Sequence, residues 1–295
     1  MKYAYFPGCS LSSTGKEYDM STRQVAKVMG IELWEIPEWN CCGASSGHLT
    51  NHLLSLALPA RNMAIAEEAG LDVAIPCAAC YMRSKAAEVA VKQSEEMRNS
   101  IEEVIERKYA GDSKARALLD IIANDLDSSS IKEKVKIQLS GIKAACYYGC
   151  LLVRPTETGF DDPEDPQTMD KIMRDLGAET VEWSDKTECC GASHASTRTE
   201  IGLKMMERIF DGAKNAGANC IVTACPMCLN NLDMRQVQVE KAAGKKYGLP
   251  VYYFTEMMGL AYGIAPEKLG LNKHFVDAMG LVNKVIKPES REETA

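Results

Sequence analysis

Short apolar runs alternate with helically spaced apolar positions along the first third of the chain. Three of these runs predict buried strands: residues 2–6, 31–36 and 73–75. Apolar residues at helical spacing predict helical stretches over 13–29, over a run that ends at Gly70, and over 82–97. Pro59 lies inside the second stretch, where we expect it to start a helix of its own. Strands that alternate with helices in this way predict a parallel sheet covered by helices.

The same order of patterns returns in the second half. Strands are predicted at residues 143–148, 181–183, 219–223 and 251–254. Helices are predicted in four places: before Gly177, through 201–209 as far as Gly217, over 227–247, and from Glu256 onward. The repeat predicts an α/β fold of two duplicated small parallel-sheet modules, related by pseudo-two-fold symmetry.

This repeat divides the chain into four expected segments. The modules are expected at residues 1–97 and 141–255, with a helical connector at 98–140 and a C-terminal helix and polar tail at 256–295. A length of 295 residues with 46% apolar composition is enough for two separate cores. The last dozen residues are polar, and we expect them to be mobile.

Ten of the twelve cysteines recur in the same order in each half. The first set is Cys9, Cys41, Cys42, Cys77 and Cys80, and the second is Cys150, Cys189, Cys190, Cys225 and Cys228. In both sets, 34 residues separate the adjacent pair from a C-x-x-C motif. Adjacent cysteines strain a mutual disulfide, so each pair is more typical of metal ligands. Both sets follow predicted strands, at the sheet edge where helix N-termini favour thiolates.

The number of cysteines in each set limits the kind of metal centre. A structural zinc site uses four ligands, and iron–sulfur clusters also usually use four cysteines. A fifth thiol therefore favours an unusual iron–sulfur cluster or a cluster with a redox-active thiol, with zinc in one module as the alternative. Cys146 and Cys220 have no counterpart in the repeat, and we expect them to be buried core residues.

Charge and composition exclude several classes of function. The net charge of −7 and pI near 5.3 argue against a nucleic-acid partner or an anionic membrane surface. The N-terminal residues lack the apolar core of a secretory signal, and no apolar run has the ~20 residues of a membrane span. We therefore expect a cytoplasmic protein in a reducing compartment. Without a nucleotide, nicotinamide or flavin motif, it is expected to receive its electrons from another protein.

Two histidines and two arginines are further candidates, because they follow the cysteines closely. His48 and His194 each come a few residues after an adjacent pair, where they could donate protons, cap a helix or lie on the surface. Arg154 and Arg198 follow Cys150 and Cys190, where they could bind anions or remain solvated.

The duplicated spacing C-x(31)-CCG-x(33)-C-x-x-C and C-x(38)-CCG-x(33)-C-x-x-C resembles the CCG-domain family. Within it, the CCGAS and CCGASH stretches, Arg154-Pro155 and Asp161-Asp162-Pro163 are similar to the B subunits of methanogen heterodisulfide reductases. The resemblance implies two noncubane [4Fe-4S] clusters, each held by one set of five cysteines. It also implies the coenzyme M–coenzyme B heterodisulfide as the substrate, reduced to two thiols in methanogenesis.

The same resemblance implies a larger complex. Its expected partners are a ferredoxin-like iron–sulfur subunit and a flavin-containing subunit of the same reductase, with a hydrogenase or formate dehydrogenase upstream. Alternatives are an electron-transfer subunit of a non-methanogenic oxidoreductase and a purely structural or relay role. Because disulfide reduction takes two electrons, two facing clusters would explain the duplication. His48 and His194 would then supply protons to the product thiolates, and Arg154 and Arg198 would bind the substrate's anionic groups.

Overall fold

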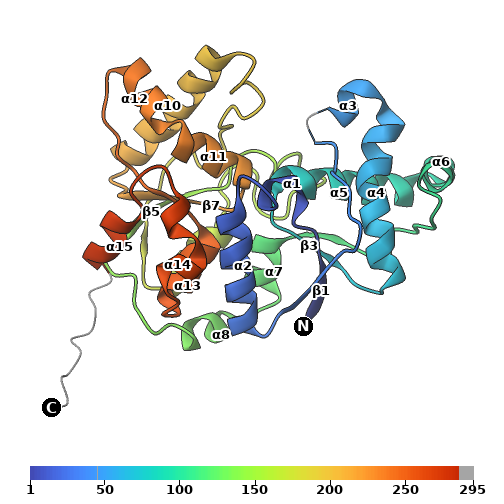
Figure 1. Ribbon diagram of the computed structural model, residues 1–295, viewed down its shortest axis with the longest axis horizontal. Coiled ribbons are helices and arrows are strands. Elements are labelled where there is room, and N and C mark those ends of the chain that lie inside the picture. Colours follow the sequence, from blue (N-terminus) through green and yellow to red (C-terminus); the bar gives the residue numbers. More distant parts are fainter. Residues whose placement is uncertain (45, 286–295) are drawn as a thin grey trace.

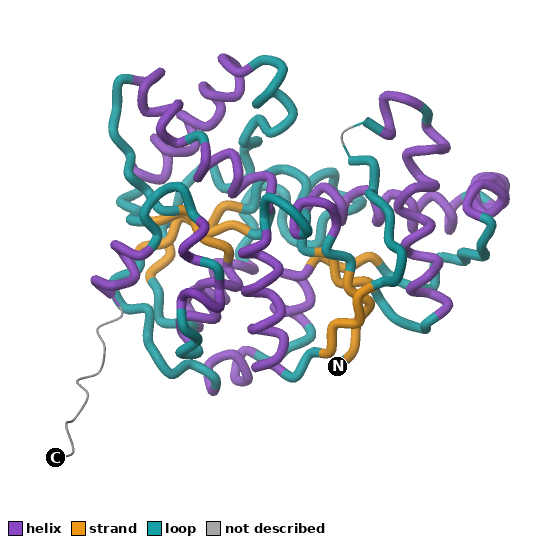
Figure 2. The backbone as a smooth tube through the Cα atoms, in the orientation of Figure 1, coloured by secondary structure: helices purple, strands orange, loops and turns teal. Residues whose placement is uncertain are grey.

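The computed structural model describes residues 1–44 and 46–285, and the expected mobile tail lies almost entirely outside these residues. Two groups of strands lie side by side in Figure 2, each forming a separate four-stranded sheet in which all neighbours are parallel. The first sheet has the order β2-β1-β3-β4, with bounds β1 Lys2–Tyr5, β2 Glu32–Glu35, β3 Val73–Ile75 and β4 Ala115–Ala117. The second has the order β6-β5-β7-β8, with bounds β5 Lys143–Tyr147, β6 Glu179–Thr180, β7 Cys220–Thr223 and β8 Val251–Tyr253. The predicted α/β class and the duplication of the sheet are thus confirmed, whereas the pseudo-two-fold relation stays a prediction.

Helices connect the parallel strands, as this topology requires. In the first half they are α1 Gly8–Leu11, α2 Lys16–Met29, α3 Gly47–Thr50, α4 His52–Glu68, α5 Ala78–Gln93, α6 Glu95–Ile105, α7 Leu118–Asn124 and α8 Ser128–Glu133. In the second half they are α9 Thr168–Asp175, α10 Thr199–Asn215, α11 Pro226–Met234, α12 Gln236–Ala243, α13 Phe254–Ala261, α14 Pro266–Leu269 and α15 Met279–Val285. A short 3₁₀ helix, Leu271–Lys273, precedes α15.

Helices from both halves fill the layer between the two sheets. In Figure 1, α2 lies beside α13 and α14, and these helices are in contact although they come from opposite ends of the chain. Tyr18 of α2 is fully buried there and stacks on Tyr253 of β8, with ring centroids 4.0 Å apart and planes 5° from parallel. The two halves therefore share one apolar core instead of forming separate ones.

Several local predictions were wrong. Residues 98–140 form more than a helical connector, because they contain β4, which pairs with β3 and completes the first sheet. Helix α4 continues through Pro59 without a break. Instead of one helix over 227–247 there are two, α11 and α12, separated at Arg235. Finally, β6 ends before residue 181, where the second strand was expected to begin.

Candidate metal centre

The first cysteine set gathers at the carboxyl ends of the strands in the first sheet. Cys9 lies in α1 directly after β1, and Cys41 and Cys42 lie in the loop that follows β2. Cys77 follows β3 as the residue before α5, and Cys80 lies in the first turn of that helix. The sheet topology therefore brings five thiols from three loops to one edge.

The second set has the same arrangement. Cys150 follows β5, Cys189 and Cys190 lie in the loop after β6, and Cys225 is the residue before α11, whose first turn carries Cys228. Every predicted cysteine thus occupies the sheet edge expected from the sequence. Cys146 in β5 and Cys220 in β7 are instead fully buried in the second sheet, as predicted, and burial raises the pKa of both thiols.

Within each set the thiols lie next to one another. The Sγ atoms of Cys42 and Cys80 are 3.2 Å apart, and those of Cys190 and Cys228 are 3.7 Å apart. The remaining hydrogen-bonding thiol contacts within the sets are Cys9 with Cys41, Cys77 with Cys80, Cys150 with Cys189, and Cys225 with Cys228. All twelve cysteines are free thiols, because these separations far exceed the ~2.05 Å of a disulfide.

The donor chemistry of each set suits a centre with several metal atoms. Cysteine thiolates are the soft ligands that iron–sulfur clusters prefer, and each set supplies one more than the usual four. No three His, Cys, Asp or Glu side chains in residues 1–44 and 46–285 surround a single point as ligands of one metal ion.

Hydrogen bonds from neighbouring thiols and main-chain N–H groups favour the thiolate form of one cysteine in each adjacent pair, whereas burial raises the pKa of Cys41. Hydrogen bonding from the Cys80 thiol lowers the pKa of Cys42 to about 7 in spite of burial, with help from the N–H of Ala44 and the charge of Arg83. Hydrogen bonding from the Cys150 thiol lowers the pKa of Cys189 to about 6, again with loop N–H groups contributing. Because thiolates are the metal-binding form, both loops are prepared for metal coordination.

Glycines allow the main chain to approach the sulfur atoms. Gly8 and Gly149 precede Cys9 and Cys150, and both have φ of +67°. A Cβ atom at Gly8 would lie 3.2 Å from the Sγ of Cys80, and one at Gly149 would lie 3.1 Å from the Sγ of Cys228. Any side chain at either position would both strain the backbone and crowd a sulfur.

The two sets meet at the boundary between the sheets. Cys77 and Cys225 are close enough there for each thiol to shift the pKa of the other, upward for Cys77 and downward for Cys225, and the N–H of Ala78 also interacts with Cys225. These interactions and the one from Cys228 place the pKa of Cys225 well below its usual value in spite of burial. Next to this contact, the Tyr18 hydroxyl donates to the Ala224 carbonyl at 3.2 Å. The ten cysteines therefore form one continuous group.

One side of each set is open to solvent. Cys9 and Cys41 are exposed and Cys150 and Cys189 are half-buried, whereas the other six cysteines of the sets are buried. A substrate would therefore approach from the side of the adjacent pairs.

The predicted histidines lie close to these pairs. His48 in α3 is exposed, and its Nδ1 is 2.8 Å from Nη2 of Arg83. Arginine has no acceptor, so Nδ1 accepts this bond and the ring proton of His48 lies on Nε2. His194 is also exposed, in the turn after Cys190, and its charge contributes to the lowered pKa of Cys189. The proposed proton transfer by either residue stays a prediction.

The predicted arginines already have protein partners. Arg154 donates from Nε to the Pro163 carbonyl and from Nη2 to Glu164 and the Thr187 hydroxyl, at 3.0–3.2 Å. Arg198 is exposed and pairs with Glu200 at 2.9 Å. Among the described residues, these bonds leave Nη1 of Arg154 and both terminal nitrogens of Arg198 available, so the binding of substrate anions by either residue stays a prediction.

The sequence analysis missed two residues that contact the pair loops. Arg83 of α5 donates to the Ala44 carbonyl at 3.3 Å, and Asn231 of α11 donates to the Cys190 carbonyl at 3.1 Å. Each lies three residues after the second cysteine of its C-x-x-C motif. This matched position in the repeat was the signal that could have found them.

A cavity of about 470 Å³ lies where the second pair loop meets α2 and α11. It is lined by three cationic side chains, those of Lys16, Arg235 and Lys273, by one carboxyl group, that of Glu17, and by the apolar side chains of Met227, Met234 and Phe275. The Nε–H of Arg235 is buried and has no hydrogen-bond partner among the described residues. The cavity suits a ligand that combines anionic and apolar groups.

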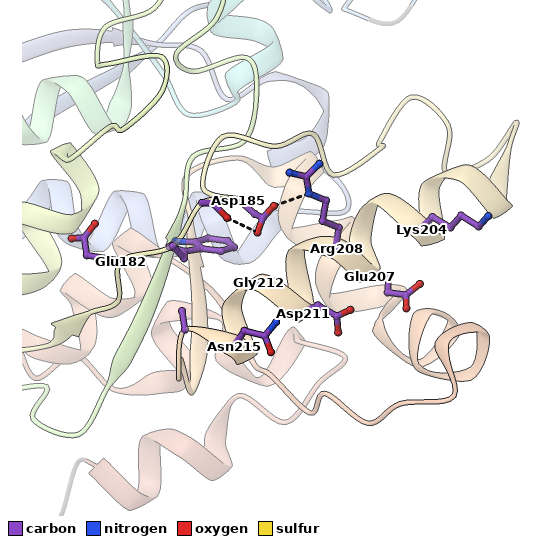
Figure 3. Close-up of a pocket in the computed structure, with 11 residues that line it drawn as sticks. Glu182, Asp185, Lys204, Glu207, Arg208, Asp211, Gly212 and Asn215 are labelled. Atoms are coloured by element: carbon purple, nitrogen blue, oxygen red, sulfur yellow. Dashed lines mark hydrogen bonds and ion pairs between the residues drawn. The ribbon is translucent and has the colours of Figure 1, made fainter.

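A second cavity, of about 650 Å³, lies along α10 (Figure 3). There, Arg208 reaches the buried carboxylate of Asp185 at 2.8 Å and also pairs with Glu188 at 3.2 Å. The described residues that line this cavity include no cysteine. Its ion pairs fasten the segment that leads into Cys189 to α10, so we assign it a supporting role.

Comparison with known proteins agrees with this geometry. The signature of the cysteine-rich domain family, CCG, matches residues 3–83 and 144–233, which include all ten cysteines of the two sets. This chain belongs to the CCG family. None of the described helices has both the length and the apolar character needed to cross a membrane.

Relatives cover nearly the whole chain. It is 35% identical over 282 residues to the 8-methylmenaquinol:fumarate reductase membrane anchor subunit of Wolinella succinogenes, covering 95% of this chain and 99% of that protein. It is 28% identical over 291 residues to the B subunit of a CoB-CoM heterodisulfide reductase, dependent on ferredoxin and F420H2, of Methanosarcina acetivorans, covering 96% and 97%. The predicted resemblance to the heterodisulfide reductase B subunits is therefore confirmed.

A solved structure shares the fold. A hypothetical protein from Helicobacter pylori superposes with a TM-score of 0.73 at 14% identity, covering 93% of this chain and 52% of that one. At this identity the match supports the fold alone.

Proposed function

We propose that this chain is the disulfide-reducing iron–sulfur subunit of a multi-subunit oxidoreductase. One observation carries the proposal: two equivalent sets of five thiols meet through Cys77 and Cys225. The relatives named as B subunits of heterodisulfide reductases support it. As the substrate we propose the coenzyme M–coenzyme B heterodisulfide of methanogenesis.

Each cysteine set would hold one noncubane [4Fe-4S] cluster. When bound, such clusters supply one-electron transfer, and two of them match the two electrons that a disulfide requires. The chain itself favours the thiolate form of Cys42 and Cys189, chiefly through hydrogen bonds from the thiols of Cys80 and Cys150 and also through the N–H groups of Ala44 and Gly191. The side of the first set that carries Cys9 and Cys41 is exposed to solvent, whereas the side where the two sets meet is buried.

The chain would also bind and protonate the substrate. We propose that the cavity with Lys16, Arg235 and Lys273 receives anionic groups, because it adjoins the second pair loop at Ala192. The rings of His48 and His194, in their protonated imidazolium form, are the proposed proton donors for the product thiolates; for His48 this requires Nδ1 to give up the bond from Arg83 when it takes up its proton.

The proposed setting is a cytoplasmic complex. Its partners would be a ferredoxin-like iron–sulfur subunit and a flavin-containing subunit of the same reductase, with a hydrogenase or formate dehydrogenase upstream. The relatives' names support the assembly itself, because a protein named as the B subunit of a reductase has partner subunits.

A second candidate is an electron-transfer subunit of a quinol-linked, non-methanogenic oxidoreductase. The 35% identity to one subunit of 8-methylmenaquinol:fumarate reductase, over 99% of that protein, favours it. In that role the two sets would pass electrons between partner subunits without binding a disulfide.

Two measurements on anaerobically purified protein test these functions. Iron and sulfide analysis should give roughly eight irons per chain if each set holds a four-iron cluster, whereas about four irons or stoichiometric zinc would contradict two clusters. A reduced viologen dye with the heterodisulfide then tests the reaction. Turnover supports the first candidate, and a fully loaded protein that the heterodisulfide does not oxidise supports the second.

A further inference from the structure

The two cysteine sets are alike in their ligands and differ in their charged surroundings. The position three residues after each C-x-x-C motif is occupied by Arg83 in the first half and by Asn231 in the second. Both side chains perform the same structural task, which is to donate a hydrogen bond to a carbonyl of the adjacent-pair loop. One of them carries a full positive charge, and the other is neutral.

Arg83 is held in place next to the first set. Its Nη2 bonds to the Ala44 carbonyl at 3.3 Å and to Nδ1 of His48 at 2.8 Å, so it links the loop after Cys42 to α3. Its Nε–H is buried and has no acceptor among the described residues. No carboxylate therefore neutralises Arg83 through a described ion pair, and its charge acts on the thiols beside it.

At the equivalent position Asn231 supplies only dipoles to the second set. Cations also lie near this set, including Arg154 and the cavity residues Lys16, Arg235 and Lys273, but among the described hydrogen bonds none of them donates to a main-chain carbonyl of the loop of Cys189 and Cys190 as Arg83 does to that of Ala44, and Arg154 reaches this loop only at the Thr187 hydroxyl. The Nδ2 of Asn231 bonds to the Cys190 carbonyl at 3.1 Å and lies 3.8 Å from the Cys190 sulfur. Asn231 is only 5% exposed, so its side chain is enclosed by its neighbours. The second set thus has a hydrogen-bond donor at the position where the first has a cation.

This difference has an electrochemical consequence. Reduction adds one negative charge to an iron–sulfur centre, so a nearby fixed cation favours the reduced form, and net charge and hydrogen bonds to sulfur are known to set the potential. We propose that the two centres are inequivalent, and that Arg83 makes the first centre the easier one to reduce. The first electron taken up by the protein is then held in the first half. This inference rests on the proposed iron–sulfur function.

The test is a redox titration of the intact, fully loaded protein, followed by electron paramagnetic resonance. The wild-type protein should show two separate midpoint potentials. Arg83→Gln should lower only the higher midpoint potential, by at least ~59 mV, which for one electron is a tenfold change in the redox equilibrium constant. Arg83→Lys keeps the charge and should retain most of the separation. Arg98→Gln, at a half-buried position of α6 that pairs with Glu95, is the matched control and should change neither potential.

A reciprocal variant makes the test independent of Arg83. Asn231→Arg adds a cation at the equivalent position and should raise the lower potential, which brings the two midpoints together. If Arg83→Gln does not retain its iron, the midpoint potentials of Asn231→Arg test the inference instead. Coincident midpoints in the wild type, or equal shifts of both midpoints in Arg83→Gln, would overturn the inference. A low iron content in the wild type would instead count against the proposed function.

Discussion

Tyr18 allows a quantitative prediction about how the two halves are joined. Its side chain is fully buried, stacks on Tyr253 across the boundary, and donates its hydroxyl to Ala224, directly before Cys225. Tyr18→Phe keeps the stacking and removes only the hydrogen bond, at a cost of ~1–2 kcal/mol because the buried carbonyl loses its donor. Tyr18→Ala also removes the ring and should cost ~3–5 kcal/mol.

Tyr109 offers a matched control within the first half. It is also fully buried, but its hydroxyl has no hydrogen-bond partner among the described residues. Tyr109→Phe should therefore be neutral or slightly stabilising. Comparison of Tyr109→Phe with Tyr18→Phe separates the hydrogen bond at the boundary from the general effect of deleting a buried hydroxyl.

The assay is thermal unfolding of the loaded protein under anaerobic conditions at one scan rate, because metal proteins often unfold irreversibly. A loss of 1 kcal/mol in the free energy of unfolding lowers the thermal unfolding midpoint by about 2–4 °C in domains slightly smaller than this chain. Tyr18→Phe should show a drop of this order and Tyr109→Phe none. Equal drops in both variants would refute the assigned role of the hydrogen bond, and an unchanged midpoint in Tyr18→Ala would refute the shared core.

Three further predictions concern the metal centre and pH. Cys189→Ser should lower the iron content of the second centre, whereas Cys220→Ser, in the buried sheet, should leave the iron content unchanged; equal losses would contradict the assignment of ligands. Gly43→Ala should reduce iron incorporation measured by colorimetric analysis, because Gly43 has φ of +69° and a Cβ would lie 2.6 Å from the side chain of Leu58; normal incorporation would show that the loop adapts. Burial alone would lower the pKa of His274, but the nearby carboxylates, chiefly that of Glu256, outweigh it and raise the pKa to about 9. Protonated His274 therefore stabilises the folded state fully below the unfolded pKa of ~6.5, and this stabilisation is lost as pH rises towards 9. Chemical denaturation between these pH values should show a decline in the free energy of unfolding that His274→Gln lacks. If the free energy of unfolding of both proteins depends on pH in the same way, His274 is not the source of the decline.

Sequence alone determined the features that depend on local order along the chain. The cysteine spacing predicted two equivalent sets at the carboxyl ends of parallel strands, because strand direction and loop position follow from the alternation of strands and helices. The burial of Cys146 and Cys220 was predictable for the same reason, since both lie inside apolar strands.

Tertiary structure decided what local pattern cannot encode. Strand β4 consists of Ala115, Arg116 and Ala117, which have no strong preference for strands, and it exists because it pairs with β3 and because Glu88 accepts the Ala115 N–H. Helix α4 passes through Pro59 although proline disfavours a helix interior. Exchanged hydrogen bonds between Asn40 and Asn62 fasten this helix to the loop before Cys41.

The contact between the two cysteine sets is also a tertiary property. Cys77 and Cys225 are far apart in the sequence, and their thiols meet only because helices from both halves pack into one layer. The same holds for Arg83, whose nearness to Ala44 and His48 depends on how α5 lies against the pair loop. Spacing in the sequence specifies which residues can be ligands, whereas the packing of distant segments specifies the charges and partners that surround them.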